Sequence, residues 1–214
     1  MKDEAKDNKI YQIMQFLGTI IEMRNLDRTN HIRNVGEIVR VIGYEFVKLY
    51  PKYNLTEEDI DVYVIASYLH DIGKIMIPDE ILKKPVALNS MEYDMLKSHT
   101  NRGCSLLAQL KGFWDDRYQT AALDICKHHH ERFDGSGYPD KLVGDNIPIS
   151  AQLVSIADVY DNLLHENVYE PAHTKEEAFH MIVSGQCGMF SPKILECFRN
   201  VRVEIEEIES SARI

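Results

Sequence analysis

Apolar residues recur at helical spacing along nearly the whole chain. One stripe of the i, i+3, i+4, i+7 type covers residues 10–21, and a second covers residues 35–46. This spacing places the apolar side chains on one face of a helix, which a globular protein buries against its core. Further helices are predicted over residues 56–69, 89–110, 117–131, 149–165, 174–184 and 191–208. No segment reads as a convincing strand, so the pattern predicts an all-α protein.

The helix predicted over residues 56–69 ends in an unusual way. Thr56 followed by three acidic residues is typical of a helix N-terminus, where the helix dipole favours negative charge. The apolar run "VYVIASYL" then stops at His70 and Asp71, and Gly73 and Lys74 follow. Polar side chains beside a buried segment cost free energy unless they are paired or bind a metal. His70, Asp71 and Lys74 therefore require partners elsewhere in the chain.

One long segment is not helical. Residues 132–148, "RFDGSGYPDKLVGDNIP", contain several glycines and prolines, which mark turns. An irregular segment of this length inside a compact domain is uncommon and is often functional. A disordered loop is the alternative. The segment is too apolar for a simple linker, however, so we expect it to be an ordered loop.

Composition and charge limit the class of protein. With 214 residues, 44% of them apolar, the chain can form one domain with a sizeable core. Its formal net charge of −10 argues against binding to polymeric nucleic acid, which requires a basic surface. A small anionic ligand remains compatible with this charge, because bound metal ions can reverse the local field.

The sequence predicts a cytoplasmic protein. No apolar run approaches the roughly 20 residues needed to span a bilayer. The first residues, "MKDEAKDNK", are charged and lack the apolar stretch of a signal peptide. The four cysteines are widely separated and form no CxxC motif, which favours reduced thiols over disulfides or a zinc site.

Histidines and acids recur together at helix-compatible positions. Asp27 and His31 are four residues apart, so they share one face of a helix. Further candidates are His70 with Asp71, His99, the run His128 to Glu131, and Asp158 with Asp161. Each of these taken alone is more often a surface or hydrogen-bonded core residue than a ligand. Taken together, imidazoles and carboxylates on several helices indicate a multi-metal centre in a helical bundle, and the absence of thiols argues against structural zinc.

Two long motifs resemble a known family. The segments "LHDIGKIMIPDEILKKP" and "HHERFDGSGYP", in this order, closely resemble the HD-GYP domain, a subgroup of the HD metal-dependent phosphohydrolases. The likeness extends from Glu22 to Asn200 and includes "GDNIPISAQLVSIADVYDNL". It implies an all-α helical bundle of the HD-domain type, with two or three iron or manganese ions in its core. The implied division is an N-terminal helix over 1–21, the HD-GYP catalytic domain over 22–200 and a C-terminal helical tail over 201–214.

The resemblance also implies roles for individual residues. The implied metal ligands are Asp27, His31, His70, Asp71, His99, His129, His130 and Asp158. Asp71 is expected to bridge two ions, and Glu22 to support the ligands rather than to bind an ion. His128 is the one histidine of its run without a counterpart, so we expect it at the surface.

The expected reaction is hydrolysis of a phosphodiester bond in a cyclic dinucleotide. The family usually opens cyclic di-GMP to pGpG and often cuts it further to GMP. Besides Asp71, the resemblance implies a catalytic Lys74 that neutralises phosphate charge or protonates the departing 3′-oxygen. A surface lysine that caps a helix dipole is the alternative for Lys74. Gly137, Tyr138 and Pro139 are expected to contact the substrate or a partner protein, and Tyr138 either stacks on guanine or anchors the loop by packing.

The chain departs from the family after Asp158. The family usually reads much like "DVYDALTSDRPYK", whereas this chain reads "DVYDNLLHENVYE". Asn167 and Glu170 therefore stand where an arginine and a lysine hold guanine and phosphate, and this loss predicts weaker binding of cyclic di-GMP.

Three hypotheses follow from this departure. The first is a cyclic di-GMP phosphodiesterase, and the second is an HD phosphohydrolase that acts on another cyclic dinucleotide or nucleotide phosphoester. The third is a catalytically weak module that binds a cyclic dinucleotide or another protein. A homodimer, or a signalling-protein partner that docks on the GYP loop, is a further expectation.

Overall fold

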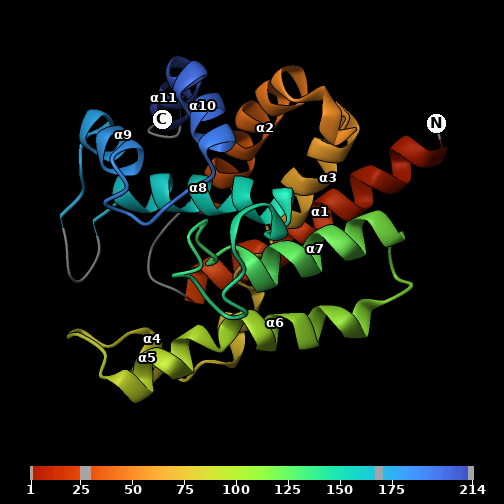
Figure 1. Cartoon of the computed structure of the whole chain (residues 1–214). Helices are drawn as coiled ribbons and strands as arrows, with labels where there is room; N and C mark the ends of the chain where they lie inside the picture. Colours follow the sequence, from red (N-terminus) through yellow and green to blue (C-terminus); the bar gives the residue numbers. More distant parts are fainter. Residues whose placement is uncertain (1, 25–29, 167–170, 212–214) are drawn as a thin grey trace.

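The computed structural model describes residues 2–24, 30–166 and 171–211, and the described residues form an all-α bundle (Figure 1). The α-helices are α1 (Lys2–Arg24), α2 (His31–Leu49), α3 (Glu57–Ser67), α4 (Asp79–Leu82), α5 (Ser90–Lys97), α6 (His99–Leu107), α7 (Asp116–His128), α8 (Ile149–Leu163), α9 (Lys175–Val183), α10 (Pro192–Asn200) and α11 (Arg202–Ser211). The short 3₁₀ turns are η1 (Pro51–Tyr53), η2 (Ile72–Met76), η3 (Ala108–Leu110) and η4 (Gly144–Asn146). The described residues contain no strand, only an isolated bridge between Lys111 and Trp114. The predicted fold class is confirmed.

The core lies where α2, α3, α7 and α8 pack together. Helix α2 packs against α3, α8 and α10, and α7 packs against α3, α6 and α8. In Figure 1, α8 crosses the middle of the molecule, with α6 and α7 on one side and α9, α10 and α11 on the other. The predicted apolar stripe of α2 faces this core, since Val35, Ile38, Val39, Ile42 and Phe46 are fully buried. Burial of such side chains is the main stabilising contribution to the fold.

Most helix boundaries agree with the prediction, and two long helices are divided. Thr56 and Asp59 form a reciprocal capping box that starts α3, as the acidic residues after Thr56 suggested. The helix predicted over residues 89–110 divides at Ser98 into α5 and α6, where the Ser98 hydroxyl donates to the carbonyl of Met95. Such side-chain bonds to the backbone compete with regular helix hydrogen bonds. The helix predicted over residues 191–208 divides likewise at Val201.

Helix α1 is closely integrated with the rest of the bundle. It runs from Lys2 to Arg24, so the expected division between residues 21 and 22 falls inside a helix. A Cβ atom at Gly18 would lie 2.5 Å from the carbonyl oxygen of Tyr68, so only glycine allows this close approach. The Arg24 guanidinium donates to the carbonyls of Lys74 at 2.9 Å and Ile77 at 2.7 Å. The end of α1 is thereby tied to the segment that follows His70 and Asp71.

The loop over residues 132–148 is ordered, as expected. The buried Glu131 carboxylate accepts hydrogen bonds from the backbone amides of Asp140 at 2.7 Å and Leu142 at 3.2 Å. The Phe133 amide donates to the carbonyl of Met189 at 2.8 Å, which ties the loop to the segment before α10. These bonds satisfy backbone groups that a helix would otherwise pair internally.

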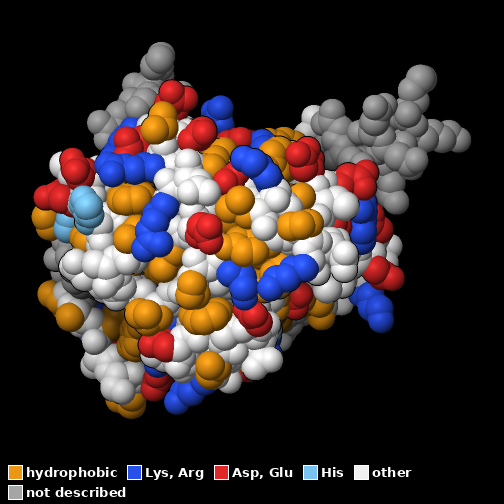
Figure 2. All heavy atoms as spheres, turned by 45° about the horizontal axis from the view of Figure 1, so that its top comes forward, with side chains coloured by type: hydrophobic (Ala, Val, Ile, Leu, Met, Phe, Trp, Pro, Cys, Tyr) orange, Lys and Arg blue, Asp and Glu red, His pale blue; other side chains and the backbone are white. Residues whose placement is uncertain are grey.

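Charged side chains of both signs are interspersed over the face shown in Figure 2. None of the described helices combines the length and apolar character that a bilayer span requires.

Candidate metal centre

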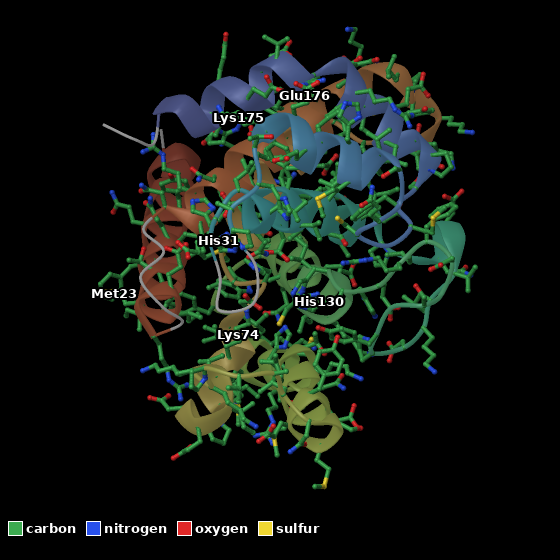
Figure 3. The ribbon with its side chains drawn as sticks, turned by 90° about the vertical axis from the view of Figure 1, so that its left-hand side faces the viewer. Met23, His31, Lys74, His130, Lys175 and Glu176 are labelled. Carbon is green, nitrogen blue, oxygen red and sulfur yellow. The ribbon has the colours of Figure 1, made fainter. Side chains whose placement is uncertain are left out.

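Five parts of the fold bring the candidate ligands to one place. His31 is the first residue of α2, and His70 and Asp71 follow the end of α3. His99 is the first residue of α6, His129 and His130 follow α7, and Asp158 lies on α8. In Figure 3, His31, Lys74 and His130 surround the same central region, while Lys175 and Glu176 lie toward one edge. Helix ends thus supply most of this site, where side chains can leave the helix surface and converge.

The ligand atoms form two clusters. The four-residue cluster consists of Asp71, His99, His129 and His130, and the three-residue cluster consists of His31, His70 and Asp158. Within each cluster the ligand atoms all lie within 4.8 Å of one another. Seven of the eight implied ligands are therefore assembled, and Asp27 lies outside the described residues.

Three histidines are held in one orientation by the backbone. Each donates its Nδ1 proton to a carbonyl oxygen three or four residues earlier in the chain. The bonds are His70 to Ser67 at 2.8 Å, His99 to Leu96 at 2.7 Å and His129 to Ile125 at 2.9 Å. Since a carbonyl oxygen only accepts, Nδ1 carries the proton and Nε2 presents a lone pair. Such bonds are the usual support of a metal-ligating imidazole.

The inward-facing atoms have no hydrogen-bond partner among the described residues. The Nε2 atoms of His70, His99 and His129 and the Oδ1 atom of Asp71 are buried without a hydrogen bond. The Asp71 Oδ1 atom lies 3.2 Å from His99 Nε2 and 3.8 Å from His129 Nε2. Lone pairs that face a carboxylate oxygen in a buried site are unfavourable without a cation between them. The residues present therefore fit a metal ion.

The protonation states of the four-residue cluster also suit a metal. Burial lowers the pKa of His129 to about 3 and holds the pKa of His130 well below its usual value. Burial opposes ionisation of Asp71, but Lys74 and the facing histidines hold the pKa of its carboxyl well below the usual value. Neutral imidazoles and an ionised carboxylate are the forms that bind divalent ions.

The three-residue cluster has a different electrostatic character. His31 Nδ1 lies 2.5 Å from Asp161 Oδ2, and His31 Nε2 lies 3.4 Å from Asp158 Oδ1. Burial acts to lower the pKa of His31, but the two carboxylates outweigh it and raise the pKa to about 10. In the metal-free protein, His31 is therefore an imidazolium ion at neutral pH.

Asp161 was a candidate beside Asp158 in the sequence, but the family resemblance gave it no role, and the structure places it against His31. Besides its contact with His31, its Oδ1 atom accepts a hydrogen bond from Asn34 at 3.0 Å, and the side chain is fully buried. Its position three residues after Asp158 on α8 was the available signal, because residues at i and i+3 share a helix face. Its partner, His31, could be assigned only from the structure, which brings the start of α2 against α8.

Lys74 is held beside the ligands. Its Nζ atom lies 2.5 Å from Asp71 Oδ2, and 19% of the side chain is exposed. It lines a cavity of about 90 Å³ together with Glu22, His31, Asp71, His130, Asp158 and Asn162. Glu22 reaches this cavity from α1 and also accepts a hydrogen bond from the backbone amide of Ile32 at 2.5 Å. Both side chains thus border the ligands without belonging to either cluster.

The GYP segment packs directly against the ligands. The Tyr138 ring stacks on His130, with ring centroids 4.7 Å apart and 25° between the planes. A Cβ atom at Gly137 would lie 2.4 Å from the Arg132 amide nitrogen, so glycine allows the loop to turn back closely. Pro139 follows through a cis peptide bond. Of the two interpretations of Tyr138, these contacts favour the packing anchor.

Other residues of interest lie outside the two clusters. His128 belongs to neither cluster and contacts Asp140 Oδ2 at 3.1 Å, although only 12% of its side chain is exposed. Asn167 and Glu170 lie outside the described residues.

Comparison with known proteins places this geometry in context. The family model of the HD domain matches residues 18–194. The chain is 40% identical over 183 residues to the cyclic di-GMP phosphodiesterase response regulator RpfG of Xanthomonas campestris, covering 86% of this chain and 44% of that protein. It is 34% identical over 185 residues to 3′3′-cGAMP-specific phosphodiesterase 2 of Vibrio cholerae, covering 86% of this chain and 33% of that protein. The chain thus spans less than half the length of either relative.

A solved structure has a similar fold. The cyclic GMP-AMP-specific phosphodiesterase of Vibrio cholerae superposes with a TM-score of 0.65 over 96% of this chain and 51% of that chain, at 18% identity.

Proposed function

The chain belongs to the HD-domain family, and on this basis we propose that it hydrolyses a phosphodiester bond of a cyclic dinucleotide, with cyclic di-GMP as the first substrate to test. The family expected from the two motifs is confirmed. The observation that carries the proposal is the pair of adjoining ligand clusters, in which Nε2 of three histidines and Oδ1 of Asp71 are buried without a hydrogen bond to any described residue.

The ligand set suits two or three divalent ions. Imidazole with carboxylate and no thiolate is compatible with iron or manganese. When bound, such ions supply a Lewis acid for a phosphate oxygen and lower the pKa of a coordinated water. Asp71 is suited to serve both clusters, because its Oδ1 atom faces His99 and its Oδ2 atom lies 3.4 Å from His70 Nε2.

Protein side chains supply a positive charge beside the ligands and hold the ligand rings in place. Lys74 presents an ammonium group in the wall of the small cavity, where it can neutralise phosphate charge or protonate the departing 3′-oxygen. Tyr138 fixes the ring plane of His130 by stacking, and Asp161 fixes the ring plane of His31. These contacts hold the ligands in place before any substrate binds.

The relatives support a choice of substrate class rather than a single substrate. One is a cyclic di-GMP phosphodiesterase and another is specific for 3′3′-cGAMP. Cyclic di-GMP opened to pGpG, with GMP as a later product, is the primary proposal. The mixed dinucleotide is the second candidate, because Asn167 and Glu170 replace the expected arginine and lysine. A non-catalytic binding module is less consistent with so complete a ligand set.

The proposal is tested with protein purified under anaerobic conditions and loaded with manganese or ferrous iron. Cyclic di-GMP, 3′3′-cGAMP and cyclic di-AMP are incubated separately, and products are separated by chromatography. We expect hydrolysis of cyclic di-GMP, and we expect Asp71→Ala to lower its rate by about a thousandfold. Binding without turnover in every metal would contradict the proposal and favour the binding module.

A double substitution tests the departure from the family. Asn167→Arg combined with Glu170→Lys restores the two positive side chains of the family pattern. We expect a lower KM for cyclic di-GMP, since an arginine adds charge-assisted hydrogen bonds to a phosphate or guanine edge. An unchanged KM would show that these positions do not limit binding.

A further inference from the structure

Two cysteines face each other across the packed helices α6 and α7. Cys104 lies on α6 and Cys126 on α7, and these helices run side by side (Figure 1). Both side chains are free thiols. Helix α6 begins at His99, and His129 directly follows α7, so each helix also places a ligand of the four-residue cluster. A change in the packing of α6 on α7 therefore acts on the positions of two ligands.

The sulfur atoms point toward the opposite helix. The Cys104 thiol donates to the Leu123 carbonyl of α7, with sulfur and oxygen 3.6 Å apart. The Cys126 thiol donates to the Thr100 carbonyl of α6 at 3.7 Å. Leu123 and Thr100 each lie about one helical turn before the opposite cysteine. A Cβ atom at Gly103 would lie 2.4 Å from Cys126 Sγ, so the glycine lets this sulfur reach the backbone of α6.

The two thiols interact with each other and differ in reactivity. The hydrogen bond between them lowers the pKa of Cys104 and, together with burial, raises the pKa of Cys126 well above its usual value. Cys104 is also partly exposed, whereas Cys126 is fully buried. The thiolate, rather than the thiol, attacks an oxidant, and it must be accessible to do so. Cys104 is therefore the thiol that meets an oxidant first, and Cys126 is the neighbour that resolves the product.

We propose that Cys104 and Cys126 are an oxidation site, at which a peroxide converts the two thiols into a disulfide between α6 and α7. The Cys104 thiolate attacks one oxygen of hydrogen peroxide, the O–O bond breaks, and a sulfenic acid and hydroxide form. The Cys126 sulfur then attacks the Cys104 sulfur, so that the S–S bond forms and the S–O bond breaks. The Cys126 proton leaves with the departing hydroxide as water. Overall, the thiol pair loses two electrons and two protons, and one peroxide molecule becomes two water molecules.

The disulfide acts on the metal centre through helix packing. It holds its sulfur atoms about 2.05 Å apart, which is closer than two hydrogen-bonded thiols. Its formation also removes both thiol protons, so the bonds to the Leu123 and Thr100 carbonyls are lost. Helices α6 and α7 therefore shift relative to each other, and their ends place His99 and His129 in the four-residue cluster. We expect the oxidised protein to bind manganese less tightly than the reduced protein.

The oxidation site is tested on the metal-free full chain, which is first reduced and then treated with hydrogen peroxide. Remaining thiols are counted by alkylation, and digestion without reductant followed by mass spectrometry identifies linked peptides. We expect loss of two of the four cysteine thiols, a peptide that links Cys104 to Cys126, and return of both thiols with dithiothreitol. A chain that keeps all four thiols, or that loses thiols without forming this link, would overturn the proposal.

Three variants assign the roles of the two sulfur atoms. Cys126→Ser keeps a donor to the Thr100 carbonyl but cannot form the disulfide, so Cys104 is expected to stop at the sulfenic acid, which dimedone labels. In Cys104→Ser, no sulfenic acid is expected at the buried Cys126. Cys197→Ala, on α10, is the control and should form the link as the wild type does. Sulfenic acid at Cys126 rather than at Cys104 would overturn the assigned order of attack. Circular dichroism checks that each variant is folded, and the linked peptide of the wild type carries the test if one is not.

Manganese binding tests the effect on the metal centre. After peroxide is removed, we expect the affinity of the oxidised chain to be at least about tenfold weaker, the usual effect of disturbing the support of a metal ligand. Dithiothreitol should restore the affinity, which distinguishes the disulfide from irreversible damage to the ligands. Treated Cys104→Ser should bind manganese within about twofold of its untreated form. Equal affinity of the linked and reduced chains would overturn the effect on the metal centre. Neither measurement requires hydrolysis, so both are independent of the proposed function.

Discussion

The two ligand clusters lie side by side but are prepared differently for a metal. In the four-residue cluster, His99 and His129 are oriented by backbone carbonyls, and their Nε2 atoms are buried without a hydrogen bond among the described residues. In the three-residue cluster, His31 is oriented by two carboxylates, which favour its protonated form. A metal ion therefore meets lone pairs in the first cluster and must displace a proton in the second.

The difference shows how the choice of supporting group sets the chemistry of a histidine ligand. A carbonyl fixes the tautomer without adding charge, whereas a carboxylate also makes the ring more basic. We expect the four-residue cluster to bind the first ion and the three-residue cluster to bind the next one with stronger dependence on pH.

The largest effect is expected from Asp71→Ala, because Asp71 faces ligands of both clusters. Hydrolysis should fall by about a thousandfold, at the upper limit for loss of one charge-stabilising group. Elemental analysis should show that bound metal falls as well. Asp134→Ala is the matched control, since Asp134 lies in the exposed part of the loop and accepts hydrogen bonds from Ser136. If Asp71→Ala kept its full metal content and its full rate of hydrolysis, Asp71 would not be a metal ligand.

The next largest effect is expected from Lys74→Met. If Lys74 acts on the phosphate, the rate should fall by about a hundredfold while metal content stays unchanged. Lys83→Met is the control, since Lys83 is more exposed and pairs with Asp79. A rate within twofold of wild type would favour the alternative in which Lys74 only caps a helix dipole.

The pH dependence of metal binding distinguishes the clusters directly. Because the pKa of metal-free His31 is raised from 6.5 to about 10, affinity of the three-residue cluster should rise about tenfold per pH unit between pH 7 and 9. The pKa of His129 is about 3, so that ring is already deprotonated and should add no such dependence to the four-residue cluster. Calorimetry in buffers of different ionisation enthalpy measures the protons released.

The same shift predicts the stability of the metal-free protein. A raised pKa in the folded state stabilises the fold fully below pH 6.5, and this contribution is lost as pH rises through about 10. Thermal unfolding of the metal-free protein between pH 6 and 10 measures this loss. For metal binding, an equal pH dependence of the first and the second ion would show that the two clusters do not differ in protonation.

The smallest effect is expected from Asp161→Asn. This change removes one of the two charges that favour His31 imidazolium, so the pKa of His31 should fall and fewer protons should be released when the second ion binds. Asp116→Asn, in the exposed first turn of α7, is the control. Unchanged proton release would assign the raised pKa of His31 to Asp158 alone.

Local sequence was sufficient for much of the fold and for the choice of ligands. The apolar stripe over residues 35–46 predicted α2 and its buried face, since helical periodicity is a local property. His70, Asp71, His129 and His130 lie within contiguous motifs, so their identity as candidates required no knowledge of the fold. The break at Ser98 was missed because no glycine or proline marks it in the sequence.

Residue chemistry and helical periodicity therefore determined the all-α class, the ordered loop and the set of candidate ligands. Only the tertiary structure decided which ligands share a cluster, that Asp158 and Asp161 together raise the pKa of His31, and that Tyr138 packs on His130. The physical reason is that protonation and orientation depend on neighbours in space. Those neighbours come from helices far apart in the chain, whose approach no local pattern specifies.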